Sequence, residues 1–139
     1  KLKVIGDLDN AIDSEPLRIL AVGQESIINS ISKNLHSEIG ENLYVTKSLP
    51  MFCEILHPDG GKGTALQWLA NRLKIDLDQT IVFGNGLDDI DMVKMAGLGV
   101  SIRNSPVELT NASDLITSAV KGNGVAKVLE FLLENGELV

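Results

Sequence analysis

The stretch from residue 80 to residue 100 reads TIVFGNGLDDIDMVKMAGLGV and constrains the fold more than any other part of the sequence. Its apolar run at 81–83 predicts a buried strand, a glycine-asparagine-glycine turn follows, and a helical pattern then runs from Asp88 to Gly97. In a parallel α/β sheet, ligands bind where the strands end. The sequence therefore predicts an α/β fold with a ligand site directly after this strand.

Polar residues gather at that turn and at two other element boundaries. Asn85, Asp88 and Asp89 follow the predicted strand. Lys62 begins another predicted helix, and Asn104 ends another predicted strand. The simpler interpretation of the two aspartates is that they only cap a helix, because carboxylates in a first helical turn complement the exposed N–H groups and the helix dipole. The combination of a lysine with carboxylates and amides favours a site for phosphate and a divalent cation.

Composition narrows the class of protein and of partner. Hydrophobic residues make up 44% of the 139 residues and aromatic residues 4%, which favours an aliphatic core of parallel strands covered by helices. The formal net charge of −7 argues against nucleic acid as a partner. A single cysteine, Cys53, excludes an intrachain disulfide and fits a reducing cytoplasm. No apolar run approaches the roughly 20 residues that span a bilayer, so we expect no membrane partner.

The order of predicted elements divides the chain near residues 57–61, where a proline and two glycines occur. Before that point we expect strands at 17–22, 43–47 and 51–56 and a helix at 24–39, with the last two strands antiparallel because their connection is short. After it, helices and strands alternate, which implies a parallel sheet. Ser105, Pro106 and Glu108 predict a helix start with Ser105 as the N-cap.

These residues resemble the motifs of a known enzyme group. The matching segments are Gly61-Lys62-Gly63, Gly84-Asn85-Gly86-Leu87-Asp88-Asp89, Met92, Ala96-Gly97, Asn104-Ser105 and Gly124-Val125-Ala126. In this order they resemble the haloacid dehalogenase (HAD) superfamily of phosphatases, and within it the Cof-type sugar-phosphatase branch. The resemblance covers residues 52–135 well and the segment from Leu17 more loosely. It implies that 1–57 is part of an α+β cap and that 58–139 is the C-terminal half of a Rossmann-like core.

The resemblance also implies a function and a role for each site residue. The expected activity is Mg²⁺-dependent phosphatase activity on small phosphorylated metabolites such as sugar phosphates. Lys62 and Asp89 match catalytic positions, while Lys62, Asp88 and Asn104 match substrate-binding positions. Asn85 and Asp89 match the Mg²⁺ side of the site.

Two departures from the family pattern shape the interpretation. The family's N-terminal Asp-x-Asp motif, which supplies the nucleophile, is not clearly present, so we expect an inactive C-terminal portion whose partner is the missing N-terminal part of the same fold. A compact, capless phosphatase using Asp7 and Asp9 is an alternative. Asn85 and Asp88 have also exchanged places relative to the family motif. This exchange predicts weakened Mg²⁺ binding and favours a further alternative, a catalytically degenerate module that binds phosphate or a partner.

Overall fold

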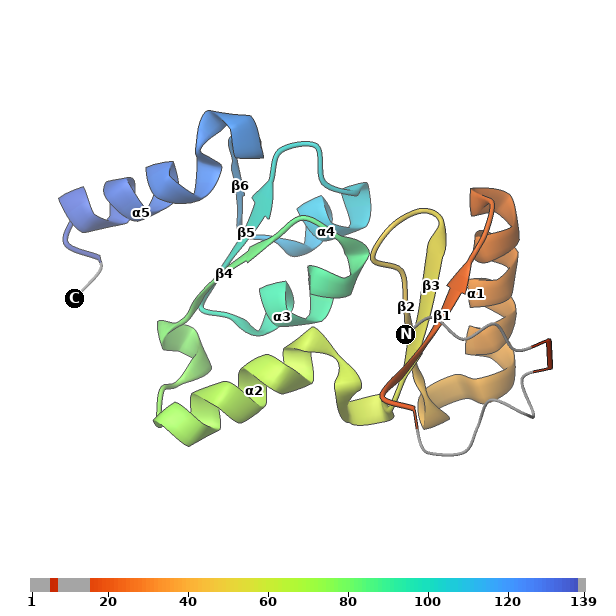
Figure 1. Ribbon diagram of the computed structural model, residues 1–139. Coiled ribbons are helices and arrows are strands. Elements are labelled where there is room, and N and C mark those ends of the chain that lie inside the picture. Colours follow the sequence, from red (N-terminus) through yellow and green to blue (C-terminus); the bar gives the residue numbers. More distant parts are fainter. Residues whose placement is uncertain (1–5, 8–15, 138–139) are drawn as a thin grey trace.

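A computed structural model describes residues 6–7 and 16–137, which form two three-stranded sheets with their own helices (Figure 1). The strand orders are β1-β3-β2 and β4-β5-β6. Asp9, from the capless alternative, lies outside the described residues. Within those residues, no helix combines the length and apolar character needed to cross a membrane.

The first sheet is antiparallel and packs one face against a single long helix. Its elements are β1 (Arg18–Val22), α1 (Glu25–Ile39), β2 (Tyr44–Thr46) and β3 (Phe52–Leu56). Ile28 of α1, Val45 and Cys53 form a buried cluster on the covered face. Because side chains alternate across a strand, the opposite face carries the other residues of each strand. Those residues are Arg18, Leu20, Val22, Tyr44, Thr46, Phe52, Glu54 and Leu56.

The second sheet is parallel, as the alternation of helices and strands predicts. Its strands are β4 (Ile81–Gly84), β5 (Leu98–Ile102) and β6 (Leu115–Thr117). Its helices are α2 (Lys62–Leu73), α3 (Ile90–Met95), α4 (Val107–Ala112) and α5 (Gly124–Glu134).

Helices cover both faces of this parallel sheet. Val82 packs with Val93 of α3 and Leu109 of α4, which form a buried cluster on one face. Val100 packs with Val128 and Leu132 of α5, and this second cluster lies on the other face. Figure 1 shows α5 on the opposite side of the strands from α3 and α4. The predicted α/β class is therefore confirmed.

The predicted cap of α4 is wrong in detail. The helix begins at Val107, and Pro106 is the N-cap residue without a side-chain cap bond. The Ser105 hydroxyl donates instead to the carbonyl of Ile102 at 2.5 Å, and the Ser105 N–H donates to the same carbonyl at 3.1 Å. Asn104 has a left-handed backbone with φ of 72°. A tight turn after β5 therefore takes up the serine that the sequence pattern assigned to the helix.

Candidate active site

Lys62 and two aspartates meet where β4 ends. Lys62 is the first residue of α2, and Asp88 and Asp89 belong to a single 3₁₀ turn (Leu87–Asp89) between β4 and α3. The Lys62 ammonium lies 2.6 Å from Asp88 Oδ2 and also donates to Asp89 Oδ1. The structure thus brings together three of the residues predicted to form the site. The Lys62 side chain remains 49% exposed, whereas the Asp89 side chain is 4% exposed.

Asp89 also organises the loop that carries Asn85. Its Oδ2 accepts the backbone N–H of Asn85 at 2.7 Å and that of Gly86 at 2.9 Å. Gly84 has no room for a side chain, because a Cβ there would lie 2.8 Å from the Asp89 Cβ. One buried carboxylate therefore fixes both the glycine turn and the lysine, which is more than a helix cap requires.

The electrostatics of the cluster stabilise the ion pairs. Burial would raise the pKa of Asp89, but the hydrogen bonds from Lys62, Asn85 and Gly86 outweigh it and lower that pKa. Burial would likewise lower the pKa of Lys62, and the two carboxylates more than reverse this, so its pKa is raised. The Lys62 ammonium and the Asp89 carboxylate are therefore both charged near neutral pH.

Close helix packing holds Lys62 next to the aspartates. A Cβ on Gly63 would lie 2.9 Å from the Asp91 Cβ and 3.1 Å from the Met95 sulfur. The first turn of α2 therefore approaches α3 at a distance that only glycine permits. This contact places Lys62 beside the turn that precedes α3.

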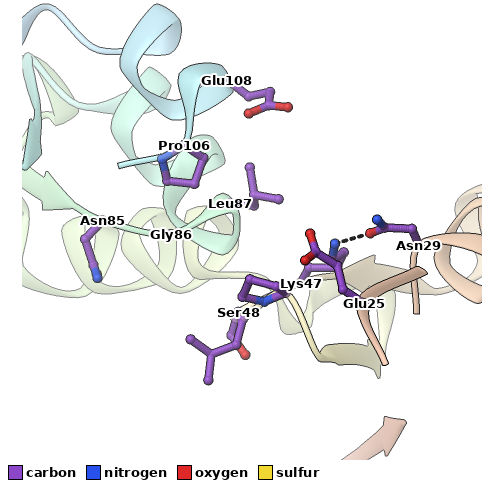
Figure 2. A pocket seen from close by; sticks show the side chains of 11 residues that line it. Glu25, Asn29, Lys47, Ser48, Asn85, Gly86, Leu87, Pro106 and Glu108 are labelled. Carbon is purple, nitrogen blue, oxygen red and sulfur yellow. Dashed lines mark hydrogen bonds between the residues drawn. The ribbon is translucent and has the colours of Figure 1, made fainter. Parts of the chain in front are cut away.

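Asn85 and Asn104 line neighbouring pockets rather than the ion-pair cluster itself. Asn85, with Gly86 and Leu87, borders a cavity of about 460 Å³ between the β4 loop and the first sheet, and Figure 2 shows Glu25, Asn29 and Lys47 on its opposite side. Lys47 donates a hydrogen bond to Asn29 there. Asn104 shares a second pocket of about 290 Å³ with Asn85. Asn85 is linked to the cluster through its backbone N–H, which donates to Asp89.

Lys62 and Asp88 open into a third cavity that sequence reasoning missed. It measures about 390 Å³, and its far wall is the face of the first sheet that α1 leaves uncovered, including Arg18 and Glu54, together with Ser48 of the connection between β2 and β3. The available signal was Glu54, a charged residue inside the apolar strand FCEIL. The sequence alone does not show that the Glu54 side chain lies on the same face as Arg18, because this depends on the pairing of β1 with β3.

The described residues do not form a complete Mg²⁺ site. Asp89 uses Oδ1 for Lys62 and Oδ2 for two N–H groups, and Asp88 Oδ2 is paired with Lys62. In the part of the chain that the structure describes, no group of three or more His, Cys, Asp or Glu could hold a metal ion. Since Mg²⁺ demands near-ideal octahedral oxygen geometry, the donors present do not fit it by themselves.

Comparison with known proteins agrees with the motifs. Residues 2–129 match the family described as haloacid dehalogenase-like hydrolase. A putative phosphatase of Haemophilus influenzae is 29% identical over 126 residues, which are 91% of this chain and 48% of that protein. A phosphoglycolate phosphatase of Archaeoglobus fulgidus is 38% identical over 78 residues, covering 56% of this chain and 35% of that protein.

Comparison of the fold with solved structures leads to the same family. A haloacid dehalogenase-like hydrolase from Bacillus subtilis superposes with a TM-score of 0.81 at 27% identity, covering 92% of this chain and 46% of that one. The chain thus spans about half the length, or less, of the relatives that it matches. With the family match, the motif order and the superposition in agreement, the chain belongs to the haloacid dehalogenase-like hydrolases.

Proposed function

We propose that the protein containing this sequence is a phosphatase that releases inorganic phosphate from small phosphomonoesters such as sugar phosphates. The observation that carries the proposal is the Lys62 ammonium, held by Asp88 and Asp89 at the end of β4 and open to a cavity. The names of the Haemophilus and Archaeoglobus relatives support the same reaction class.

Lys62 supplies the positive charge for the phosphoryl group in this proposal. An ammonium group has three N–H donors, and two of them are directed at Asp88 and Asp89. The third has no partner among the residues that the structure describes and can donate to a phosphoryl oxygen, where it stabilises negative charge in the transition state. The first free N–H groups of α2 add positive potential at the same place.

The remaining site residues have positioning and binding roles. Asp89 keeps Lys62 and the β4 loop in place through its buried carboxylate. Asp88 and Asn104 are proposed to contact substrate, with Asn104 reaching it from the neighbouring pocket.

The proposed division of labour extends beyond the described residues. Residues 1–57 form part of a cap and 58–139 the C-terminal part of the hydrolase core, while the attacking carboxylate comes from another segment of the same fold. The whole protein is proposed to use Mg²⁺, with Asn85 and Asp89 on the metal side and the other ligands in that segment. The 139-residue chain alone is expected to be inactive.

A direct assay tests this proposal. Phosphate release from para-nitrophenyl phosphate is measured with MgCl₂ and with EDTA, for this chain and for a longer natural polypeptide that contains it. We expect magnesium-dependent turnover by the longer protein only. Turnover by this chain that Asp7→Asn abolishes would instead support the capless phosphatase.

A non-catalytic phosphate-binding or partner-binding module is the second candidate. The exchange of Asn85 and Asp88 favours it, because the carboxylate of Asp88 is paired with Lys62 and the side chain of Asn85 carries no charge. Absence of turnover by the longer protein together with retained phosphate binding would support the module. Under the phosphatase proposal, the double variant Asn85→Asp, Asp88→Asn should bind Mg²⁺ more tightly. An unchanged affinity would count against the idea that the exchange weakens Mg²⁺ binding.

A further inference from the structure

We propose that Arg18 and Glu54 form a leaving-group subsite that selects a neutral, hydroxyl-bearing group over one with a second negative charge. This inference rests on the proposed function, since it names the substrate class of the same site. It concerns the wall of the cavity opposite Lys62.

The subsite lies on the face of the first sheet that α1 leaves uncovered. Arg18 of β1 pairs with Leu56, and Glu54 pairs with Thr46, so these side chains share one face. They line the cavity of about 390 Å³ together with Ser48, Lys62 and Asp88. A phosphomonoester whose phosphoryl group lies at Lys62 would therefore extend its leaving group toward this wall.

The wall is held in place by a buried carboxylate. Glu54 is 8% exposed, its Oε2 accepts from Arg18 Nη1 at 2.9 Å, and its Oε1 accepts from the Ser48 hydroxyl. A charge buried in this way has a high desolvation cost, which the two partners offset. The Arg18 side chain is 54% exposed, so its other N–H donors remain available to a ligand.

The charges of this wall decide which ligand it fits. Arg18 and Glu54 sum to zero, so a carboxylate entering the wall meets no net positive charge and lies near the Glu54 carboxylate. A hydroxyl group can accept from Arg18 and donate to Thr46 or to Glu54. The arrangement therefore favours the polyol part of a sugar phosphate and disfavours a phosphorylated carboxylic acid.

The test uses nuclear magnetic resonance titration of this chain, which contains the whole cavity and is expected not to turn over its ligands. Glucose 6-phosphate represents the neutral leaving group, and phosphoglycolate represents the carboxylate. The wild-type chain should bind glucose 6-phosphate about tenfold more tightly. Equal affinities, preference for phosphoglycolate, or no binding of either ligand would overturn the subsite.

Two substitutions should move the preference in opposite directions. Glu54→Gln frees the charge of Arg18 and should shift the affinity ratio about tenfold toward phosphoglycolate. Arg18→Gln leaves the Glu54 charge uncompensated and should shift the ratio further toward glucose 6-phosphate. Each variant is compared with the wild-type chain on its own, so either one tests the inference if the other does not fold. Ratios that stay unchanged in the folded variants would contradict the inference.

A matched control and a separate readout complete the design. Arg72→Gln removes an arginine that stacks on Trp68 with 5.6 Å to the ring centroid, away from the cavity lining, and should leave the ratio unchanged. Turnover of para-nitrophenyl phosphate by the longer protein tests the proposed function separately from the subsite. Failure of that assay and failure of the affinity ratio are therefore distinguishable.

Discussion

The Tyr44 hydroxyl donates a hydrogen bond to Asp91 Oδ2 at 3.0 Å and thereby joins the first sheet to α3. The Tyr44 ring also lies against Gly61, where a Cβ would come within 3.1 Å of the ring. One tyrosine of β2 thus contacts both the residue before Lys62 and the helix that follows Asp89. The position of the first sheet and the geometry of the ion-pair cluster are therefore coupled.

Replacing Tyr44 with phenylalanine should remove this link and its pH dependence. The hydrogen bond is expected to contribute about 0.5–1.5 kcal/mol at neutral pH. Burial and the Asp91 carboxylate raise the pKa of Tyr44 from 10.0 to about 12. The contribution should therefore be complete below the ordinary pKa of 10.0 and should disappear as the pH rises through about 12.

Urea unfolding at several alkaline pH values measures this effect. The difference in unfolding free energy between the wild-type chain and Tyr44→Phe should narrow over that interval. A difference that stays constant through pH 12 would show that the hydroxyl is not held as described.

Gly63→Ala should separate Lys62 from the aspartates. The added methyl group would meet the Asp91 Cβ at 2.9 Å and the Asp91 backbone carbonyl carbon at 3.3 Å, so α2 has to move away from α3. We expect a loss of about 1–3 kcal/mol in unfolding free energy, despite the better helix propensity of alanine. Gly23→Ala is the control, because its methyl group would make only ordinary contact with Ile28 at 3.7 Å. Equal stability of both variants would refute the close contact of α2 and α3.

Cys53 should be unreactive in the folded chain. It is 0% exposed in the cluster with Ile28 and Val45, and burial raises the pKa of its thiol. Little thiolate is then present near neutral pH, and a reagent cannot reach it. Ellman's reagent should label the chain quickly in urea and slowly in buffer. Equal rates in both solutions would contradict the packing of β3 on α1.

Much of the fold was predictable because local patterns agree with the tertiary structure. The apolar run at 81–83 became β4, and the helix predicted to begin at Lys62 begins there as α2. Short connections indicated which strands are antiparallel, and the alternation after Lys62 indicated the parallel sheet. The meeting of Lys62 with Asp88 and Asp89 followed from the rule that loops converge at the carboxyl ends of parallel strands.

The rest depends on contacts between segments that are distant in sequence. The role of Glu54 requires the pairing of β1 with β3, which determines that Arg18 lies on the same face. Tyr44 reaches Asp91 across 47 residues, and nothing local in either segment indicates it. The misassigned Ser105 shows the opposite error, since its local capping pattern was outweighed by a turn at the end of β5.

Asp89→Asn should change how stability depends on acid. Hydrogen bonds lower the pKa of Asp89, so its contribution is present above the unfolded-state pKa of about 3.9 and is lost as the pH falls through the folded-state pKa. Removing this charge should cost about 1.5–3 kcal/mol at neutral pH, because Lys62 loses a buried partner. Thermal unfolding between pH 7 and strongly acidic solution should show the gap between the two proteins closing as the pH falls. A gap that persists in acid would mean that Asp89 is not ionised in the native chain.

The most direct test of the account is the rate of para-nitrophenyl phosphate hydrolysis by the longer natural protein with Lys62→Met. Loss of the ammonium should lower kcat/KM by about 100-fold or more, because the transferred phosphoryl group loses its cationic partner. The control is Lys33→Met, which removes an exposed lysine of α1 and should retain the wild-type rate. An active longer protein in which Lys62→Met and Lys33→Met hydrolyse the ester equally fast would contradict the central claim.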